Sequence, residues 1–210
     1  MKRKHIIYLI LLLAAVFLIA KWTFKHFNFN TTYSVGQKID SLNGVYVYYN
    51  GGVSHVSGRN LAPDSYNLGM KYQCVEFVKR YYYERLQHKM PDSYGNAKDF
   101  FDNKLADGAK NTKRDLVQYT NPSKTKPCVD DLLVYNATVL NTYGHVAIIA
   151  RVTDKDIEVI QQNPGPFGTS RETFALKQEN GTWVIANNRI VGWLRKEMVV
   201  NDNPGFIGKQ

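Results

Sequence analysis

Cysteine is scarce in this chain, because the 210 residues include two, Cys74 and Cys128. A secreted scaffold stapled by disulfides needs many more, and a metal site built from thiolates alone needs four. A chain of this length buries enough apolar surface to fold without crosslinks. We therefore exclude both classes, expect one globular domain, and consider each cysteine by itself.

Other signals are absent too. The histidines and cysteines lack the spacing of metal ligands, so we expect neither a metal nor another cofactor. The chain has no internal repeat, no low-complexity tract, and no zinc knuckle or other nucleic-acid-binding motif. The sequence therefore favours a function that protein side chains perform without a metal or cofactor.

The one long uncharged run lies near the N-terminus. Basic residues 2–4 precede the uncharged residues 6–20, which is the pattern of an export signal. This run is shorter than the roughly 20 residues that span a bilayer, yet aromatic residues typical of a membrane interface follow it. We predict a signal peptide or membrane anchor at residues 1–24. The aromatic residues are Trp22, Phe24, Phe27 and Phe29.

The leader is a poor substrate for cleavage. Leu18 stands two places before Ala20, where a small residue is required, and no cysteine follows to carry a lipid. We therefore expect an uncleaved anchor followed by a stalk at residues 25–43. The chain body would then lie on the outer side of a bacterial cell membrane, facing a periplasm or a cell wall. Cleavage would instead make the protein secreted.

The chain body is basic. The formal charge of +9 falls to +6 without Lys2, Arg3 and Lys4. Such an excess suits an anionic partner such as a cell-wall polymer or the membrane surface, although dispersed surface lysines would give the same value. Export and the absence of a binding motif argue against nucleic acid as a partner, and the oligomeric state is left open.

The pattern along the body predicts helices followed by strands. Apolar residues recur at helical spacing from Cys74 to about His88, a shorter helix is expected at residues 96–105, and residues 54–69 have the composition of a loop. This order indicates an α+β domain at residues 44–200, with N-terminal helices packed on an antiparallel sheet, before a tail at 201–210. The expected strands are residues 45–49, 131–135, 145–150, 157–161, 183–185 and 190–194.

Cys74 lies where a loop turns into the predicted helix. Unpaired N–H groups and the macrodipole of a first turn stabilise an anion, and the thiolate is the nucleophilic form of cysteine. We therefore expect this thiol to ionise well below the free-cysteine pKa of about 8.5. The backbone N–H of Cys74 and the side chain of Gln73 are candidate oxyanion donors, although Gln73 could equally face solvent.

His145 is the candidate base for this nucleophile. It follows Gly144 at the start of a strand, where alternation puts it on one face with Ala147 and Ile149, and we expect that face to pack on the helix of Cys74. A core histidine bonded to the backbone is the alternative. His88 is a weaker candidate, because it lies roughly 20 Å away at the far end of the helix.

Gln161 is the candidate that orients His145. It ends a strand on the same face as Ile157 and Val159, and its amide oxygen can accept from one ring nitrogen and leave the other for the nucleophile. Asn163 is the alternative or additional orienting residue. An amide fixes the tautomer, but it does not stabilise an imidazolium as a carboxylate does.

Three further residues have expected roles. We expect Asp131 to hydrogen-bond the adjacent loop and Trp193 to lie in the core. Cys128 either pairs with Cys74 in an oxidising compartment or is a small buried side chain next to Pro127. We favour the second, because a permanent disulfide would block the nucleophile.

Five motifs resemble, in order and spacing, the CHAP family of cysteine, histidine-dependent amidohydrolases and peptidases. The similarity covers roughly residues 44–196 and extends especially to the amidase domain of bifunctional glutathionylspermidine synthetase/amidase. The motifs are QCVEF at 73–77, DLLVY at 131–135, GHVAII at 144–149, QQN at 161–163 and VGWLR at 191–195.

The resemblance implies a papain-like fold and amide cleavage through a thioester, with Cys74 as nucleophile and His145 as base. The family commonly has Glu where this chain has Gln161, which implies reduced activity, and Asn163 matches the family's Asn. Together with export and charge, the resemblance predicts a peptidoglycan amidase or endopeptidase. The alternatives are an amidase of a small soluble amide such as glutathionylspermidine, or a cell-wall-binding module weakened in catalysis at Gln161.

Overall fold

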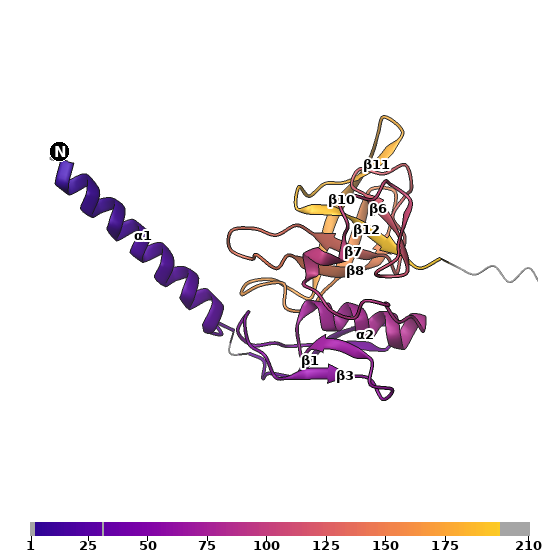
Figure 1. The fold of residues 1–210 in the computed structure, drawn as a ribbon, viewed down its shortest axis with the longest axis horizontal. Helices are drawn as coiled ribbons and strands as arrows, with labels where there is room; N and C mark the ends of the chain where they lie inside the picture. Colours follow the sequence, from indigo (N-terminus) through magenta and orange to yellow (C-terminus); the bar gives the residue numbers. More distant parts are fainter. Residues whose placement is uncertain (1–2, 31, 198–210) are drawn as a thin grey trace, which may run out of the picture.

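A computed structural model describes residues 3–30 and 32–197, which form a long N-terminal helix and a mixed helix and sheet body (Figure 1). The α+β class expected from the sequence is confirmed. The tail expected at 201–210, and the last three residues of the expected domain, lie outside the described residues.

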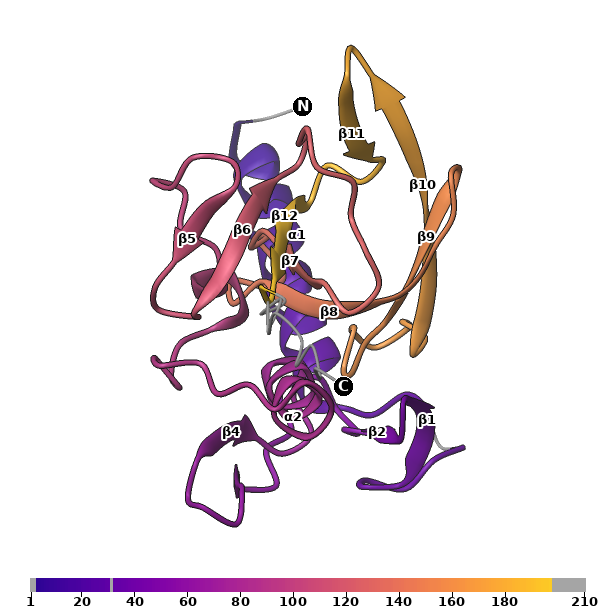
Figure 2. The same ribbon diagram turned by 90° about the vertical axis from the view of Figure 1, so that its right-hand side faces the viewer.

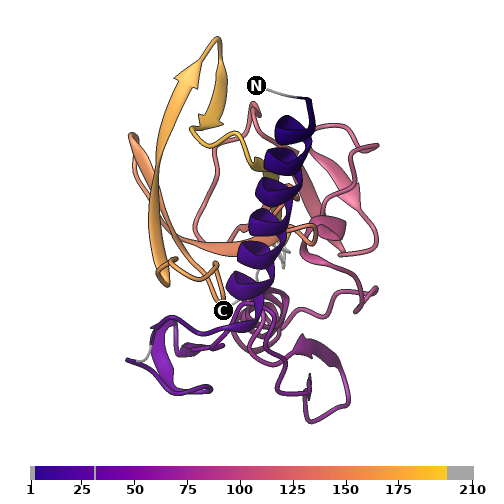
Figure 3. The same cartoon turned by 90° about the vertical axis from the view of Figure 1, so that its left-hand side faces the viewer.

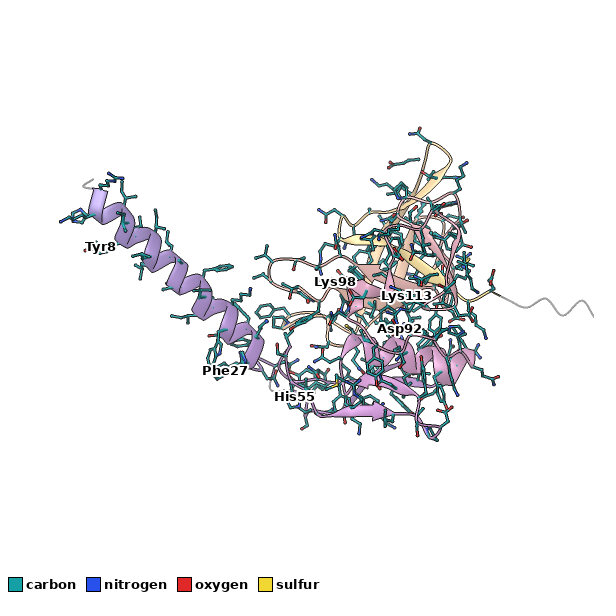
Figure 4. The ribbon with its side chains drawn as sticks, viewed as in Figure 1. Tyr8, Phe27, His55, Asp92, Lys98 and Lys113 are labelled. Atoms are coloured by element: carbon teal, nitrogen blue, oxygen red, sulfur yellow. The ribbon has the colours of Figure 1, made fainter. Side chains whose placement is uncertain are left out.

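Helix α1 (Arg3–His26) is longer than the uncharged run that predicted it. Its 24 residues extend about 36 Å at 1.5 Å per residue, compared with roughly 30 Å of bilayer hydrocarbon. By length and composition it is the one described helix apolar enough to cross a membrane. Its side chains are unburied and project into open space, as Tyr8 does in Figure 4, and only its C-terminal end meets the body (Figures 1 and 3).

The body is built on an antiparallel sheet of eight strands, in the spatial order β11-β10-β9-β8-β7-β12-β6-β5. The sheet curls around an apolar core (Figure 2). Ser123 and Trp183 exchange two backbone hydrogen bonds, which join the segment after β6 to the far edge strand and help to close the curl. The strands are β5 (Ala109–Asn111), β6 (Leu116–Thr120), β7 (Leu132–Tyr135), β8 (His145–Val152), β9 (Asp156–Ile160), β10 (Arg171–Glu179), β11 (Thr182–Ile185) and β12 (Ile190–Arg195).

Helix α2 (Cys74–Leu86) packs on the outside of the curled sheet. Its buried Phe77 and Val78 share a core with Val146 and Ile148 of β8. The alternate β8 residues, Ala147 and Ile149, point to the core inside the curl. Strand periodicity therefore gives the sheet two apolar faces, one for the helix and one for its own interior.

Two hairpins extend the fold beyond the predicted elements. β1 (Lys38–Leu42) pairs with β2 (Val45–Tyr48), so the folded part begins inside the segment expected to be a stalk. β3 (Arg59–Leu61) pairs with β4 (Asn67–Met70) inside the segment expected to be a loop. The second helix expected at 96–105 is wrong, because only one 3₁₀ turn, η1 (Ala97–Phe100), forms there.

Two other sequence expectations are confirmed by the fold. The Asp131 carboxylate accepts from the backbone N–H of Cys128 at 2.7 Å and forms a bidentate ion pair with Arg195, which ties the start of β7 to the end of β12. Trp193 is fully buried inside the curl. The favoured interpretation of Cys128 is wrong, because its side chain is exposed; both cysteines are free thiols.

Candidate active site

A cavity of about 490 Å³ opens beside the N-terminal end of α2. Cys74, His145, Gln73 and Asn163 all line it, although they come from α2, β8 and the segments next to them. The fold therefore brings the four residues to one hollow on the molecule.

Cys74 is the first residue of α2 and is half-buried. Burial raises the pKa of its thiol to about 11, and this effect outweighs the opposing backbone N–H groups of Val146, Val75 and Cys74 itself. The expectation that the thiol ionises well below pH 8.5 is therefore contradicted. A helix N-terminus favours the anion, but removal of water from the sulfur costs more here.

This raised pKa has a measurable consequence. In a Cys128→Ser variant, we expect the rate of Cys74 alkylation by iodoacetamide to rise continuously from pH 7 to pH 10, because the thiolate fraction increases over the whole range. Mass spectrometry of the alkylated protein measures the rate, and a Cys74→Ser variant reports the reaction of the exposed Cys128 alone. A plateau already reached at pH 7 would contradict the buried thiol.

His145 is the first residue of β8 and is 7% exposed. Its Nε2 lies 3.0 Å from Oε1 of Gln161, and its ring lies 5.4 Å from the ring of Tyr135. This contact leaves Nδ1 for the cavity that Cys74 lines. Gly144 allows the placement, since a Cβ there would lie 2.8 Å from the carbonyl oxygen of Tyr135.

The face of β8 that carries His145 differs from our expectation. His145 lies on the interior face with Ala147 and Ile149, whereas the helix packs on the face of Val146 and Ile148. The ring still reaches the cavity because His145 begins the strand at the rim of the curled sheet. Because His145 is the first residue of β8, no earlier residue of the strand covers its ring on that side. The ring can therefore extend past the end of the strand into the cavity.

Burial also lowers the pKa of His145, to about 4. The hydrogen bond to Gln161 raises this pKa and the charge of Arg189 lowers it, but both effects are smaller than desolvation. Both members of the Cys74 and His145 pair are therefore neutral near pH 7. The arrangement suits a histidine that removes the proton during attack rather than a preformed ion pair.

The amide of Gln161 has one orientation that satisfies its neighbours. Its Nε2 donates to the backbone oxygen of Thr169 at 3.1 Å and to Oε2 of Glu172 at 3.3 Å, so its oxygen must point at His145. The oxygen then accepts the Nε2–H of the ring, which selects the tautomer with a free lone pair on Nδ1.

Asn163 and Gln73 contact each other rather than the imidazole. Asn163 Nδ2 donates to Oε1 of Gln73 at 2.7 Å and to the backbone oxygen of Val53 at 2.9 Å. Gln73 Nε2 donates to the backbone oxygens of His55, at 2.8 Å, and Val53, at 3.3 Å. The side-chain donors of Gln73 are thus engaged by the loop, and the N–H of Cys74 is the donor that remains at the first turn of α2.

The sequence analysis missed the buried group that ties the end of β9 to the nucleophile helix. Gln162 donates to Oε2 of Glu76 at 2.8 Å and to the backbone oxygen of Gln73 at 3.0 Å. Glu76 is held in turn by Arg80 at 2.7 Å. Strand alternation was the available signal, because it turns Gln162 toward the helix whenever Gln161 faces inward.

The candidate catalytic residues lie in a segment that is similar to a known domain. Residues 65–163 match the family model of the CHAP domain, and this segment contains Cys74, His145, Gln161 and Asn163. This match agrees with the resemblance of the five motifs, and a CHAP domain implies a hydrolase of the amidase or peptidase kind.

Two relatives come from Crithidia fasciculata. Trypanothione synthetase is 29% identical over 136 residues, which cover 63% of this chain and 21% of the relative. Glutathionylspermidine synthase is 30% identical over 139 residues, which cover 60% of this chain and 19% of the relative. The chain thus spans about a fifth of the length of these relatives.

Proposed function

We propose that this protein is a cysteine amidase or endopeptidase of papain-like arrangement that is anchored in a bacterial membrane and cleaves amide bonds of peptidoglycan. The observation that carries the proposal is the cavity that Cys74 and His145 both line, with the His145 ring oriented by Gln161 at 3.0 Å. The CHAP domain supplies the reaction class.

The reaction follows from the positions of these groups. Nδ1 of His145 takes the thiol proton as Sγ of Cys74 attacks the amide carbon, and the N–H of Cys74 stabilises the oxyanion. The imidazolium then gives its proton to the leaving amine as the C–N bond breaks, which leaves a thioester. Water, deprotonated by the same ring, attacks the thioester and releases a carboxylic acid and the free thiol.

The N-terminal helix supports a substrate at the cell surface. The backbone oxygen of Lys25, near the end of α1, accepts from the N–H of Ser54 at 3.2 Å, and Lys25 lines the same cavity as Cys74. An anchor that spans the membrane would thereby hold the cavity close to the bilayer. The positive charge of the body suits the anionic polymers of a cell wall.

Two other functions have observations in their favour. Similarity to trypanothione synthetase and glutathionylspermidine synthase favours an amidase of a small soluble amide such as glutathionylspermidine, whereas α1 favours a substrate outside the cell. The amide at Gln161 favours a cell-wall-binding module with weakened catalysis.

The deciding experiment incubates the full chain in detergent with purified peptidoglycan and, separately, with glutathionylspermidine, and identifies new amine and carboxyl ends by mass spectrometry. Peptidoglycan fragments with new ends support our proposal. Cleavage of glutathionylspermidine alone identifies the small-amide enzyme, and binding to peptidoglycan with no new ends identifies the binding module.

Replacement of Gln161 should impair this reaction without abolishing it. In Gln161→Ala we expect kcat/KM to fall about tenfold to a hundredfold, because the ring loses the acceptor that selects its tautomer but keeps its place in β8. Steady-state kinetics on the cleaved substrate measure the effect. Gln178→Ala, at an exposed position in β10, is the matched control. An unchanged rate in Gln161→Ala would remove this residue from the site.

A further inference from the structure

A carboxylate stands directly behind the amide that occupies the third position of the site. Oε2 of Glu172, on β10, lies 3.3 Å from Nε2 of Gln161, whose oxygen lies 3.0 Å from the His145 ring. The neighbouring cation Arg171 pairs with Asp40 and Glu158, so it does not occupy the Glu172 carboxylate. Glu172 lies outside the segment 65–163 that matches the CHAP domain.

We propose that Glu172 is a positioning residue that acts on His145 through Gln161, and that its negative charge supplies the carboxylate that the third position lacks. The kinetic part of this inference rests on the proposed function. A direct triad has a carboxylate that bonds the histidine, whereas this chain would place an amide, just after β9, between the histidine and a carboxylate on β10.

The hydrogen bonds of Gln161 explain how the Glu172 carboxylate fixes the orientation of the amide. An amide presents nearly the same shape in either orientation, so its direction is set by its partners. Gln161 Nε2 faces two acceptors, the Thr169 oxygen and the Glu172 carboxylate, and a flipped amide would place oxygen against both. The Thr169 oxygen only orients the amide, whereas the Glu172 carboxylate also places a negative charge behind it.

The charge matters because the imidazolium formed during the reaction has little other support. In the described part of the chain, Cys74 from α2, Tyr135 from β7 and Arg189 from the segment before β12 face or act on His145. The cavity that His145 lines is also lined by the cations Lys25 and Arg59 and by Tyr94 and Tyr143. Cys74 and Tyr135 are neutral near pH 7, and Arg189 disfavours a cation. Glu172 is exposed, so solvent screens its effect without cancelling it.

The first test needs no enzymatic activity. In a ¹⁵N NMR titration of the full chain in detergent, with His145 assigned through His145→Gln, we expect Glu172→Gln to lower the pKa of His145 by about 0.5 unit. Glu179→Gln removes the same charge at the far end of β10 and should leave that pKa unchanged. An equal pKa in wild type and Glu172→Gln would overturn the proposal, whether or not the protein is a hydrolase.

The second test looks for a reversal of sign. In the wild-type background, Glu172→Gln should lower kcat/KM about threefold to tenfold, and both limbs of the pH profile should move to lower pH. In a Gln161→Glu background, the same Glu172→Gln change should raise kcat/KM, because it removes a like charge and offers an amide donor to the new carboxylate. A decrease of equal size in both backgrounds would show a merely structural role and would overturn the proposal.

Discussion

Replacement of Cys74 by alanine is expected to lower kcat/KM for amide cleavage by at least about a thousandfold. Cys74 provides the sulfur that lines the cavity beside His145, and the second thiol, Cys128, is exposed in the segment before β7. Without Sγ no thioester forms. The base then has no thiol proton to remove, and the oxyanion donor has no tetrahedral intermediate to stabilise.

The measurement is initial-rate kinetics on the substrate identified by mass spectrometry. Cys128→Ser serves as the matched control, since it removes the other free thiol and should leave the rate unchanged. Circular dichroism of each variant checks the fold. Cleavage by Cys74→Ala at more than about a tenth of the wild-type rate would exclude a cysteine mechanism.

Replacement of His145 by alanine is expected to be nearly as damaging, with a loss of about a thousandfold in kcat/KM. The raised pKa of the Cys74 thiol, about 11, leaves few thiolates at neutral pH, so attack depends on a base that takes the proton. A thiol that ionised by itself would depend on His145 much less. The size of the loss in kcat/KM therefore also tests whether Cys74 and His145 are both uncharged before attack.

The pH dependence separates these two cases. Without His145, we expect the residual rate to rise with pH up to at least pH 10, following ionisation of the buried thiol. His26→Ala is the control, because its ring bonds the backbone oxygen of Trp22 and stacks on the Trp22 ring, and both contacts lie within α1. A residual rate that is flat from pH 6 to pH 10 would argue that Cys74 is already ionised.

Much of the fold was predictable because strong periodicities have short-range causes. The apolar positions of α2 and the β-branched runs of β7, β8, β9 and β12 led to correct elements, since helix and strand each bury one stripe or face. The expected helix at 96–105 failed because its residues form a 3₁₀ turn followed by irregular structure. β10 was missed because only Phe174 and Leu176 are buried among its charged and polar residues.

The members of the candidate site were predictable, but their geometry was not. Motif order and residue chemistry selected Cys74, His145 and Gln161, and the fold places all three around one end of α2. Because the sheet curls, α2 packs on the face of β8 that carries Val146 and not on the face that carries His145. His145 therefore reaches the cavity from the rim of the sheet. Asn163 could not be separated from Gln161 by sequence, yet its contacts are with Gln73 and Val53.

The sequence by itself determined the apolar leader, the α+β class, the CHAP resemblance and the residues that can perform amide chemistry. These properties depend on residue type and on spacing along the chain. The tertiary structure decided the protonation of those residues and their partners. Burial makes Cys74 and His145 a neutral pair, and the pairing of β9 with β10 sets the Glu172 carboxylate behind Gln161. Desolvation and contact across strands depend on what surrounds a group in space, and spacing in the chain does not specify that.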